Sequence, residues 1–176
     1  RSELMQQAEF PLAWKNSTDM ANSIFFPFNG YDIDSFTSEV TRLPRIRYNR
    51  DKPFTRDVVY HHRYDPSSIV TKPFAYIIPK GWHVVIERLQ ANGVKMERLR
   101  SDTQMMVSVY CIDSFKTFRE PFEKHYKHYQ VRANADKAFV QFRQGDYWIT
   151  TNQKAVRYLV EVLEPSSEDG FFAWNF

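Results

Sequence analysis

Two stretches of the chain carry apolar residues at the spacing of an amphipathic helix. The first consists of Trp82, Val85, Ile86 and Leu89, which recur at positions i, i+3, i+4 and i+7. This pattern predicts a helix near residues 81–92, followed by Gly93 at the position where helices commonly end in a left-handed residue. A second helix is predicted near residues 153–164, with Asn152 as its N-cap and Pro165 blocking its continuation.

Most of the remaining chain alternates apolar and polar residues or is interrupted by proline, which is typical of strands and turns. Residues 24–60 are predicted to form short strands, and residues 61–73 a connecting loop. Residues 94–99 resume as a strand after the first helix and complete a strand–helix–strand unit. Residues 138–142 and 147–149 flank a glycine turn and are predicted to pair as a hairpin.

These elements predict an α+β fold with mostly antiparallel sheets, two main helices and one strand–helix–strand unit. Residues 1–20 mix a short helix-like start with polar turn formers, and we interpret them as a tether or as the start of the fold. Residues 21–176 are expected to form a single α+β domain, because a chain of this length can bury about 70% of its surface in one core.

The composition excludes several classes of function. The five glycines are widely separated, so the chain has no glycine-rich nucleotide loop and no serine-hydrolase elbow. A net charge of +3 is too small for a dedicated nucleic-acid binder, and no apolar run reaches the length of a membrane span. Cys111 is the single cysteine, and the alternation around it predicts an inert thiol in the core.

The histidines are the first place to look for a metal site or a catalytic base. His125, His128 and Glu123 are candidate zinc ligands, since imidazole and carboxylate groups bind this metal. On a strand, however, the spacing of the two histidines would send their rings to opposite faces, and Lys124 and Lys127 would repel a cation. The pattern therefore favours surface histidines over a metal centre.

The stretch 42–56 is basic and also contains aromatic rings. Arg45, Arg47 and Tyr48 within it are candidate ligands for phosphates or acidic glycans. The same alternation describes the solvated face of an antiparallel strand, which the low net charge favours. Trp148 is a further candidate, because exposed rings can stack on sugars. It belongs to a set of four rings for which core packing is the alternative: Trp14, Tyr147, Trp148 and Trp174.

The end of the chain is rich in aromatic residues. Phe171, Phe172, Trp174 and Phe176 fall within six residues. Left in water they would form an apolar patch of a kind that soluble monomers usually avoid. We therefore expect this segment to pack back on the second helix or on a neighbouring sheet.

A set of short motifs in a fixed order resembles a known family. The motifs are Phe28-Asn29-Gly30-Tyr31, Ser38-Glu39-Val40-Thr41, Lys52-Pro53-Phe54, Ala75-Tyr76-Ile77-Ile78-Pro79 with Trp82, Glu120-Pro121-Phe122-Glu123-Lys124-His125-Tyr126, Gly145-Asp146-Tyr147, Thr151-Asn152-Gln153, Leu163-Glu164-Pro165, and Asp169 with Trp174-Asn175-Phe176. They resemble the region that follows the catalytic domain in large exported bacterial zinc carboxypeptidases of the M14 type, especially those of Bacteroidetes-like organisms. Lys124 and Gly170 depart from the family, which usually has Gly and Ser at these two turns.

The resemblance implies a role in a secreted or periplasmic peptide hydrolase. The zinc ligands of that family, a His-x-x-Glu pair and a distant His, belong to the upstream catalytic domain, and no residue of this chain matches them. The resemblance therefore implies no catalytic residue and no cofactor in this fragment, with zinc in the absent catalytic domain. It implies a non-catalytic accessory domain whose partner is that catalytic domain or an envelope or glycan surface. The alternatives are a carbohydrate- or envelope-binding module and an independent enzyme.

Overall fold

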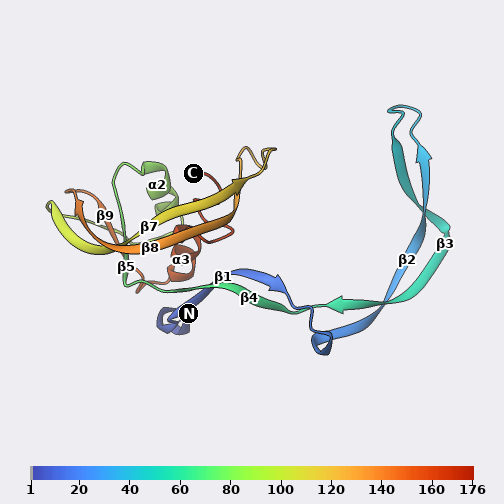
Figure 1. Ribbon diagram of the computed structural model, residues 1–176, viewed down its shortest axis with the longest axis horizontal. Coiled ribbons are helices and arrows are strands. Elements are labelled where there is room, and N and C mark those ends of the chain that lie inside the picture. Colours follow the sequence, from blue (N-terminus) through green and yellow to red (C-terminus); the bar gives the residue numbers. More distant parts are fainter. Residues whose placement is uncertain (1) are drawn as a thin grey trace. The chain divides into compact units, whose positions relative to one another are not determined.

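The chain forms two compact units in the computed structural model, which describes residues 2–176 (Figure 1). One unit combines the N-terminal residues up to Trp14 with Pro66–Phe176, and the other consists of Lys15–Asp65. The predicted division into residues 1–20 and 21–176 places its boundary elsewhere in the chain, and it stays a prediction. Among the described residues, no helix is long and apolar enough to cross a membrane.

A small sheet and two helices form the core of the first unit. The sheet has the order β5 (Ala75–Ile78), β9 (Tyr147–Thr150), β6 (Glu97–Arg98), and β9 pairs antiparallel with both neighbours. Helix α2 (His83–Ala91) lies in sequence between β5 and β6, as the predicted strand–helix–strand unit requires, although β6 has only two residues. Helix α3 (Val156–Leu163) packs in the same apolar core. The buried core residues are Ile78, Val85, Ile86, Leu89, Val94, Tyr147, Ile149, Leu159 and Val162.

The two helices form where the apolar periodicity predicts them, but Asn152 is not the N-cap of the second helix. Gly93 follows α2 with a φ of 73°, the left-handed conformation expected there. Helix α3 begins at Val156 rather than directly after Asn152, and no side chain caps it. The reason is the buried side chain of Gln153, whose Nε2 donates to the carbonyls of Lys95 and Thr150. These bonds hold the preceding residues in a turn instead of a first helical turn.

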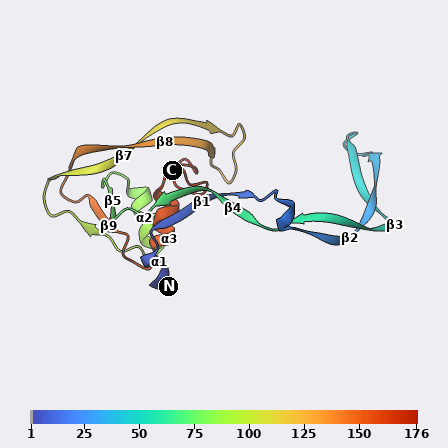
Figure 2. The same ribbon diagram turned by 60° about the horizontal axis from the view of Figure 1, so that its bottom comes forward.

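Two long strands form a separate antiparallel ribbon in the first unit. Figure 2 shows β7 (Thr103–Thr117) and β8 (His128–Phe142) side by side along their length. The predicted hairpin between residues 138–142 and 147–149 is therefore wrong, because β8 pairs with β7 and β9 pairs with β5 and β6. Asp146 explains the change of sheet, since its carboxylate accepts from the backbone N–H groups of both Arg143 and Lys80. Cys111 lies exposed on β7, not in the core as predicted.

The aromatic C-terminal segment packs back on the first unit, as predicted. The backbone N–H of Phe171 donates to the carbonyl of Val162 at 2.9 Å, and Phe171 contacts the core cluster. Ala173 is buried and accepts from the backbone N–H of His128. The last helix and the start of β8 therefore both hold this segment.

The N-terminal part adds a short helix, α1 (Ser2–Gln6), and a two-stranded sheet of β1 (Glu9–Asn16) and β4 (Tyr64–Thr71). The predicted loop over residues 61–73 is wrong, because most of it is strand β4. Phe10 of β1 is fully buried in a second cluster with Val156 and Val160.

The second unit is dominated by one long antiparallel hairpin. Its strands are β2 (Ser23–Thr37) and β3 (Pro44–His61), preceded by a 3₁₀ turn at Met20–Asn22. The strands are much longer than predicted, because Pro27 and Pro53 lie within them instead of ending them. Each strand of a two-stranded sheet has one edge without a partner, and proline is tolerated at such an edge.

Candidate functional site

The paired ends of β7 and β8, the loop between them and the C-terminal segment carry a set of aromatic rings, which we call the ring cluster. Its members are Phe115, Phe118, Phe122, His125, His128, Tyr129, Phe172, Trp174 and Phe176. At the loop tip, Phe122 and His125 exchange two backbone hydrogen bonds of 2.9 Å. Glu123 and Lys124 between them have φ values of 48° and 70°. Lys124 therefore occupies a turn position that favours glycine.

The structure separates the three candidate metal ligands. The His125 ring lies 4.6 Å from the Phe176 ring, whereas the His128 ring lies 4.4 Å from Phe115. His128 also shares a 2.9 Å hydrogen bond between its Nδ1 and the Thr117 hydroxyl. Glu123 is exposed on the turn. Over residues 2–176, no group of three or more His, Cys, Asp or Glu side chains is placed to hold a metal ion.

Cationic side chains hold the C-terminal rings in place. The Lys127 Nζ lies 4.3 Å from the centre of the Trp174 ring and 3.6 Å from the Asp169 carboxylate, which also accepts from the Trp174 indole N–H. The Arg88 guanidinium of α2 lies 4.2 Å from the centre of the Phe176 ring. Such cation–π contacts favour a fixed ring orientation. The ring cluster is therefore anchored at its base by α2 and by the loop.

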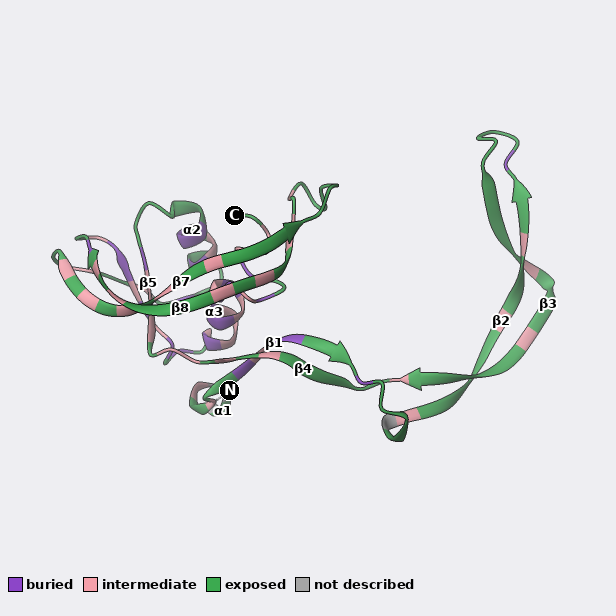
Figure 3. Cartoon of the chain, in the orientation of Figure 1, coloured by how far each residue is buried: buried purple, intermediate pink, exposed green. Residues whose placement is uncertain are grey.

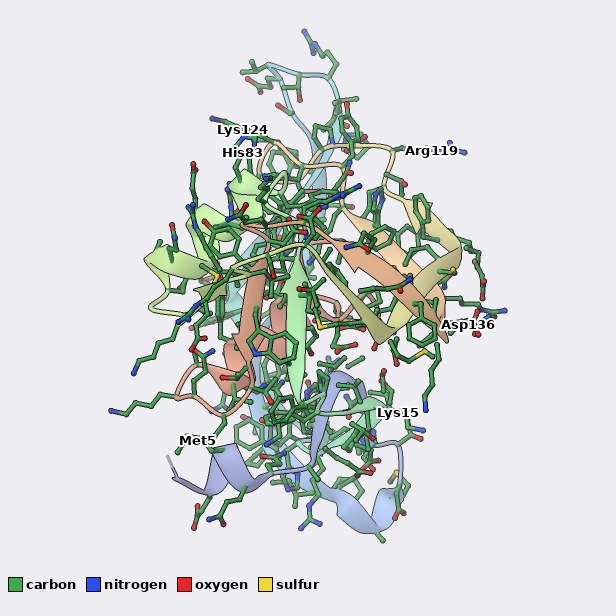
Figure 4. All side chains as sticks on the ribbon, turned by 90° about the vertical axis from the view of Figure 1, so that its left-hand side faces the viewer. Met5, Lys15, His83, Arg119, Lys124 and Asp136 are labelled. Atoms are coloured by element: carbon green, nitrogen blue, oxygen red, sulfur yellow. The ribbon has the colours of Figure 1, made fainter. Side chains whose placement is uncertain are left out.

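The rim of the ring cluster is open to solvent. Phe118 and Tyr129 stack with their ring centres 4.5 Å apart, and half of Phe118 is exposed. Both rings line two shallow hollows, one of about 220 Å³ that also includes Lys127 and one bordered by Arg119. Figure 4 shows the Arg119 side chain extending outward from the ribbon. A stacked ring pair with charged side chains of both signs beside it, such as Arg119 and Glu120, can bind a protruding side chain of a partner.

The candidates of the basic stretch lie on β3 in the second unit. Arg45, Arg47 and Tyr48 are all exposed. The Arg47 Nε lies 3.9 Å from the Asp34 carboxylate, and its guanidinium lies 5.7 Å from the Phe36 ring centre. Both partners belong to β2, so the opposite strand offsets part of the positive charge. A role in binding phosphates or acidic glycans stays a prediction.

The four candidate sugar-stacking rings do not form one platform. Trp148 lies half-buried in β9, 6.2 Å from the Phe74 ring, and Tyr147 beside it is buried. Trp174 belongs to the ring cluster, and Trp14 is exposed on β1. Trp148 and the candidates on β3 lie in different units.

A buried carboxylate joins three elements of the first unit. Glu164, directly after α3, accepts hydrogen bonds from the hydroxyls of Tyr76 on β5 and Tyr110 on β7. Burial, and then the charge of Glu164, raise the pKa of Tyr76 far above its usual range. Burial and the hydrogen bond to Glu164 raise the pKa of Tyr110 in the same way. The two hydroxyls remain protonated donors at neutral pH, so this triad joins β5, β7 and the end of α3 through hydrogen bonds.

The apolar residues of the hairpin are not among the candidates predicted from the sequence. Ile24, Phe26 and Phe28 alternate along β2, and Phe54, Val58 and Tyr60 lie on β3. We call these six residues the apolar face of the hairpin. The alternation is visible in the sequence, but Phe25 between two of its members hides it.

Comparisons with known proteins give a partial match to carboxypeptidases. The chain is 28% identical to carboxypeptidase 2 of Trichophyton rubrum over 111 residues, which is 63% of this chain and 20% of that protein. Carboxypeptidase 2 of Trichophyton tonsurans and that of Trichophyton equinum are also 28% identical, each over 109 residues. The match thus spans about a fifth of the length of these curated relatives. No family model and no solved structure matches the chain. The chain therefore contains a region related to part of carboxypeptidase 2.

Proposed function

We propose that this chain is a non-catalytic accessory domain that follows the catalytic domain of an exported zinc carboxypeptidase of the M14 type. In this proposal it packs on the catalytic domain and positions it for the hydrolysis of C-terminal peptide bonds. The zinc ion and the groups that activate water belong to that catalytic domain.

The observation that carries the proposal is the exposed rim of the ring cluster. Its stacked rings, Phe118 and Tyr129, stand beside Arg119. They line a hollow together with Lys127, whose ammonium group contacts the Trp174 ring of the C-terminal segment. Aromatic and arginine side chains are enriched at the energetic centres of protein interfaces. The similarity to part of carboxypeptidase 2 supports a carboxypeptidase catalytic domain as the partner.

Substitution of one rim residue in the parent polypeptide tests this function. Phe118→Ser should lower the thermal midpoint of the attached catalytic domain, because it removes a ring from the contact. The kcat of the Phe118→Ser variant with a short peptide should stay within about twofold of the unmodified value, since the substitution changes no reacting group. Phe139→Ser is the matched control, because Phe139 is a ring on β8 outside the ring cluster that is somewhat more exposed than Phe118. The same midpoint for both variants, or loss of kcat in folded Phe118→Ser, would refute the proposal.

A further inference from the structure

The hairpin of the second unit has no core of its own. In Figure 3 the exposed colour runs along most of β2 and β3. Of the residues in Lys15–Asp65 whose burial is described, only Ser17 and Ser38 are buried. A two-stranded hairpin alone is marginally stable in water. The length of β2 and β3 therefore requires a surface that covers one of their faces.

The strand register shows which face this is. Phe26 lies opposite Val58, and the next pair along, Phe25 opposite Val59, points to the other side. The rings of the apolar face touch across the strands, with Phe28 and Phe54 at 6.4 Å between ring centres. Gly30 contributes to this layer, because a Cβ at this position would lie 2.7 Å from the Phe54 ring. The missing side chain leaves room for the Phe54 ring beside Gly30.

The opposite face of the hairpin carries its own polar contacts. The hydroxyl of Thr55 donates to the side-chain oxygen of Asn29 at 2.7 Å, and Ser23 hydrogen-bonds His61 at 2.8 Å. These polar groups already have partners. The opposite face is therefore the more polar one, although Phe25 and Val59 also lie on it, and the apolar face gains more from being covered.

The charge of the second unit favours a neutral, apolar partner. Residues 15–65 contain eight Lys and Arg against seven Asp and Glu. Arg56 lies on the same side of the hairpin as the apolar face. Its guanidinium is 4.2 Å from the Phe54 ring centre and 3.5 Å from the Asp32 carboxylate. Such a surface provides little electrostatic attraction for a polyanion. The same apolar face on a second copy is also nearly neutral, so it is a suitable partner.

The area is sufficient for a pair of identical faces. Ile24, Phe26, Phe28, Val58 and Tyr60 are between 39% and 52% exposed. Large side chains bury roughly 150–250 Å² each, so these five offer on the order of 500 Å² per copy. Two copies would bury about 1,000 Å², which is the lower limit for a specific interface.

We propose that the apolar face of the hairpin binds the same face of a second copy of this chain. The two hairpins stack as a two-layer sheet with their strands nearly aligned, about 10 Å apart, as in other sheet-on-sheet packings. Each hairpin thereby supplies the second layer that the other lacks. This inference does not depend on the carboxypeptidase-related function.

Sedimentation equilibrium of the 176-residue chain tests the proposal with a matched pair of variants. The unmodified chain should be dimeric at micromolar concentration. The double variant Phe26→Thr/Val58→Thr should raise the dissociation constant of the dimer about 100-fold, because each copy loses two central contacts. The double variant Phe25→Thr/Val59→Thr makes the same residue changes one position along, on the other face. Its dissociation constant should stay within about threefold of that of the unmodified chain. Threonine is used because it maintains strand propensity.

The outcomes separate the possible occupants of this face. A chain that is monomeric at 100-fold higher concentration would overturn the proposal, and the face would then belong to the first unit or to another protein. A dimer that survives the Phe26 and Val58 changes would also overturn it. So would a dimer that both variants weaken equally. Hydrogen exchange at the amides of β2 and β3 verifies that each hairpin remains formed.

Discussion

At the scale of single residues, the buried Glu164 carboxylate provides the clearest test of the fold. Tyr76→Phe removes one of its two hydroxyl donors and leaves a buried charge short of a partner. The free energy of unfolding should fall by about 1–3 kcal/mol, measured by urea denaturation. Tyr158→Phe is the control, because its exposed hydrogen bond from Asn92 is replaced by water, and it should cost about 0.5 kcal/mol or less. Equal losses for the two variants would contradict this account of Glu164.

The same tyrosines predict a loss of stability at high pH. The folded state raises the pKa of both Tyr76 and Tyr110, so it retains protons that the unfolded chain releases above its ordinary tyrosine pKa of about 10. Their stabilisation is therefore complete below pH 10 and is lost as the pH rises above it. Urea titrations at pH 8 and pH 11 should show this loss, and Tyr76→Phe should reduce it. An unchanged pH dependence in Tyr76→Phe would exclude Tyr76 as its source.

Some residue-level features were predictable from the sequence and others were not. Gly93 was correctly predicted, because its left-handed conformation follows from local chain geometry alone. The prediction for His125 and His128 placed both on one strand, but β8 begins at His128. The two rings contact different aromatic side chains of the C-terminal segment. Those contacts are distant in sequence, so residue spacing could not show them.

At the scale of elements, the C-terminal segment should contribute substantially to stability. Truncation before Gly170 removes the buried Ala173 and the rings that Lys127 and Arg88 contact. Because burying one large ring contributes roughly 1.5–3 kcal/mol, the loss should be several kcal/mol, visible as a lower thermal midpoint. Removal of Phe176 alone, which is more exposed, should have a much smaller effect. If the truncated chain melts at the same temperature, the segment is a free linker.

The elements also show how much of the fold a hydrophobic pattern can predict. Helical periodicity located α2 and α3 because each helix makes its hydrogen bonds within itself. Strand alternation shows which residues share a face, but it does not name the pairing strand. Alternation therefore did not distinguish the pairing of β8 with β7, the strand before it, from a pairing with β9, the strand after it. The pairing of β4 with β1 spans the whole second unit in sequence, so no local pattern could show it.

At the scale of the whole molecule, no change in composition marks the division into two units. The second unit is inserted between two strands of one sheet, β1 and β4, so the first unit is discontinuous in sequence. A scan along the chain has no signal for such an insertion. The exposed surfaces of both units are aromatic and lie on strands or their connecting loops, which is typical of contact surfaces.

Our central proposal is that this chain binds a partner and does not itself catalyse peptide hydrolysis. The direct measurement is the release of C-terminal amino acids from peptides by the purified chain, with and without added zinc. The account predicts no release above the buffer blank for peptides ending in aromatic, basic or acidic residues. His62→Ala, at an exposed position on the other unit, serves as the control for His125→Ala. Release that His125→Ala abolishes and His62→Ala leaves intact would contradict the claim.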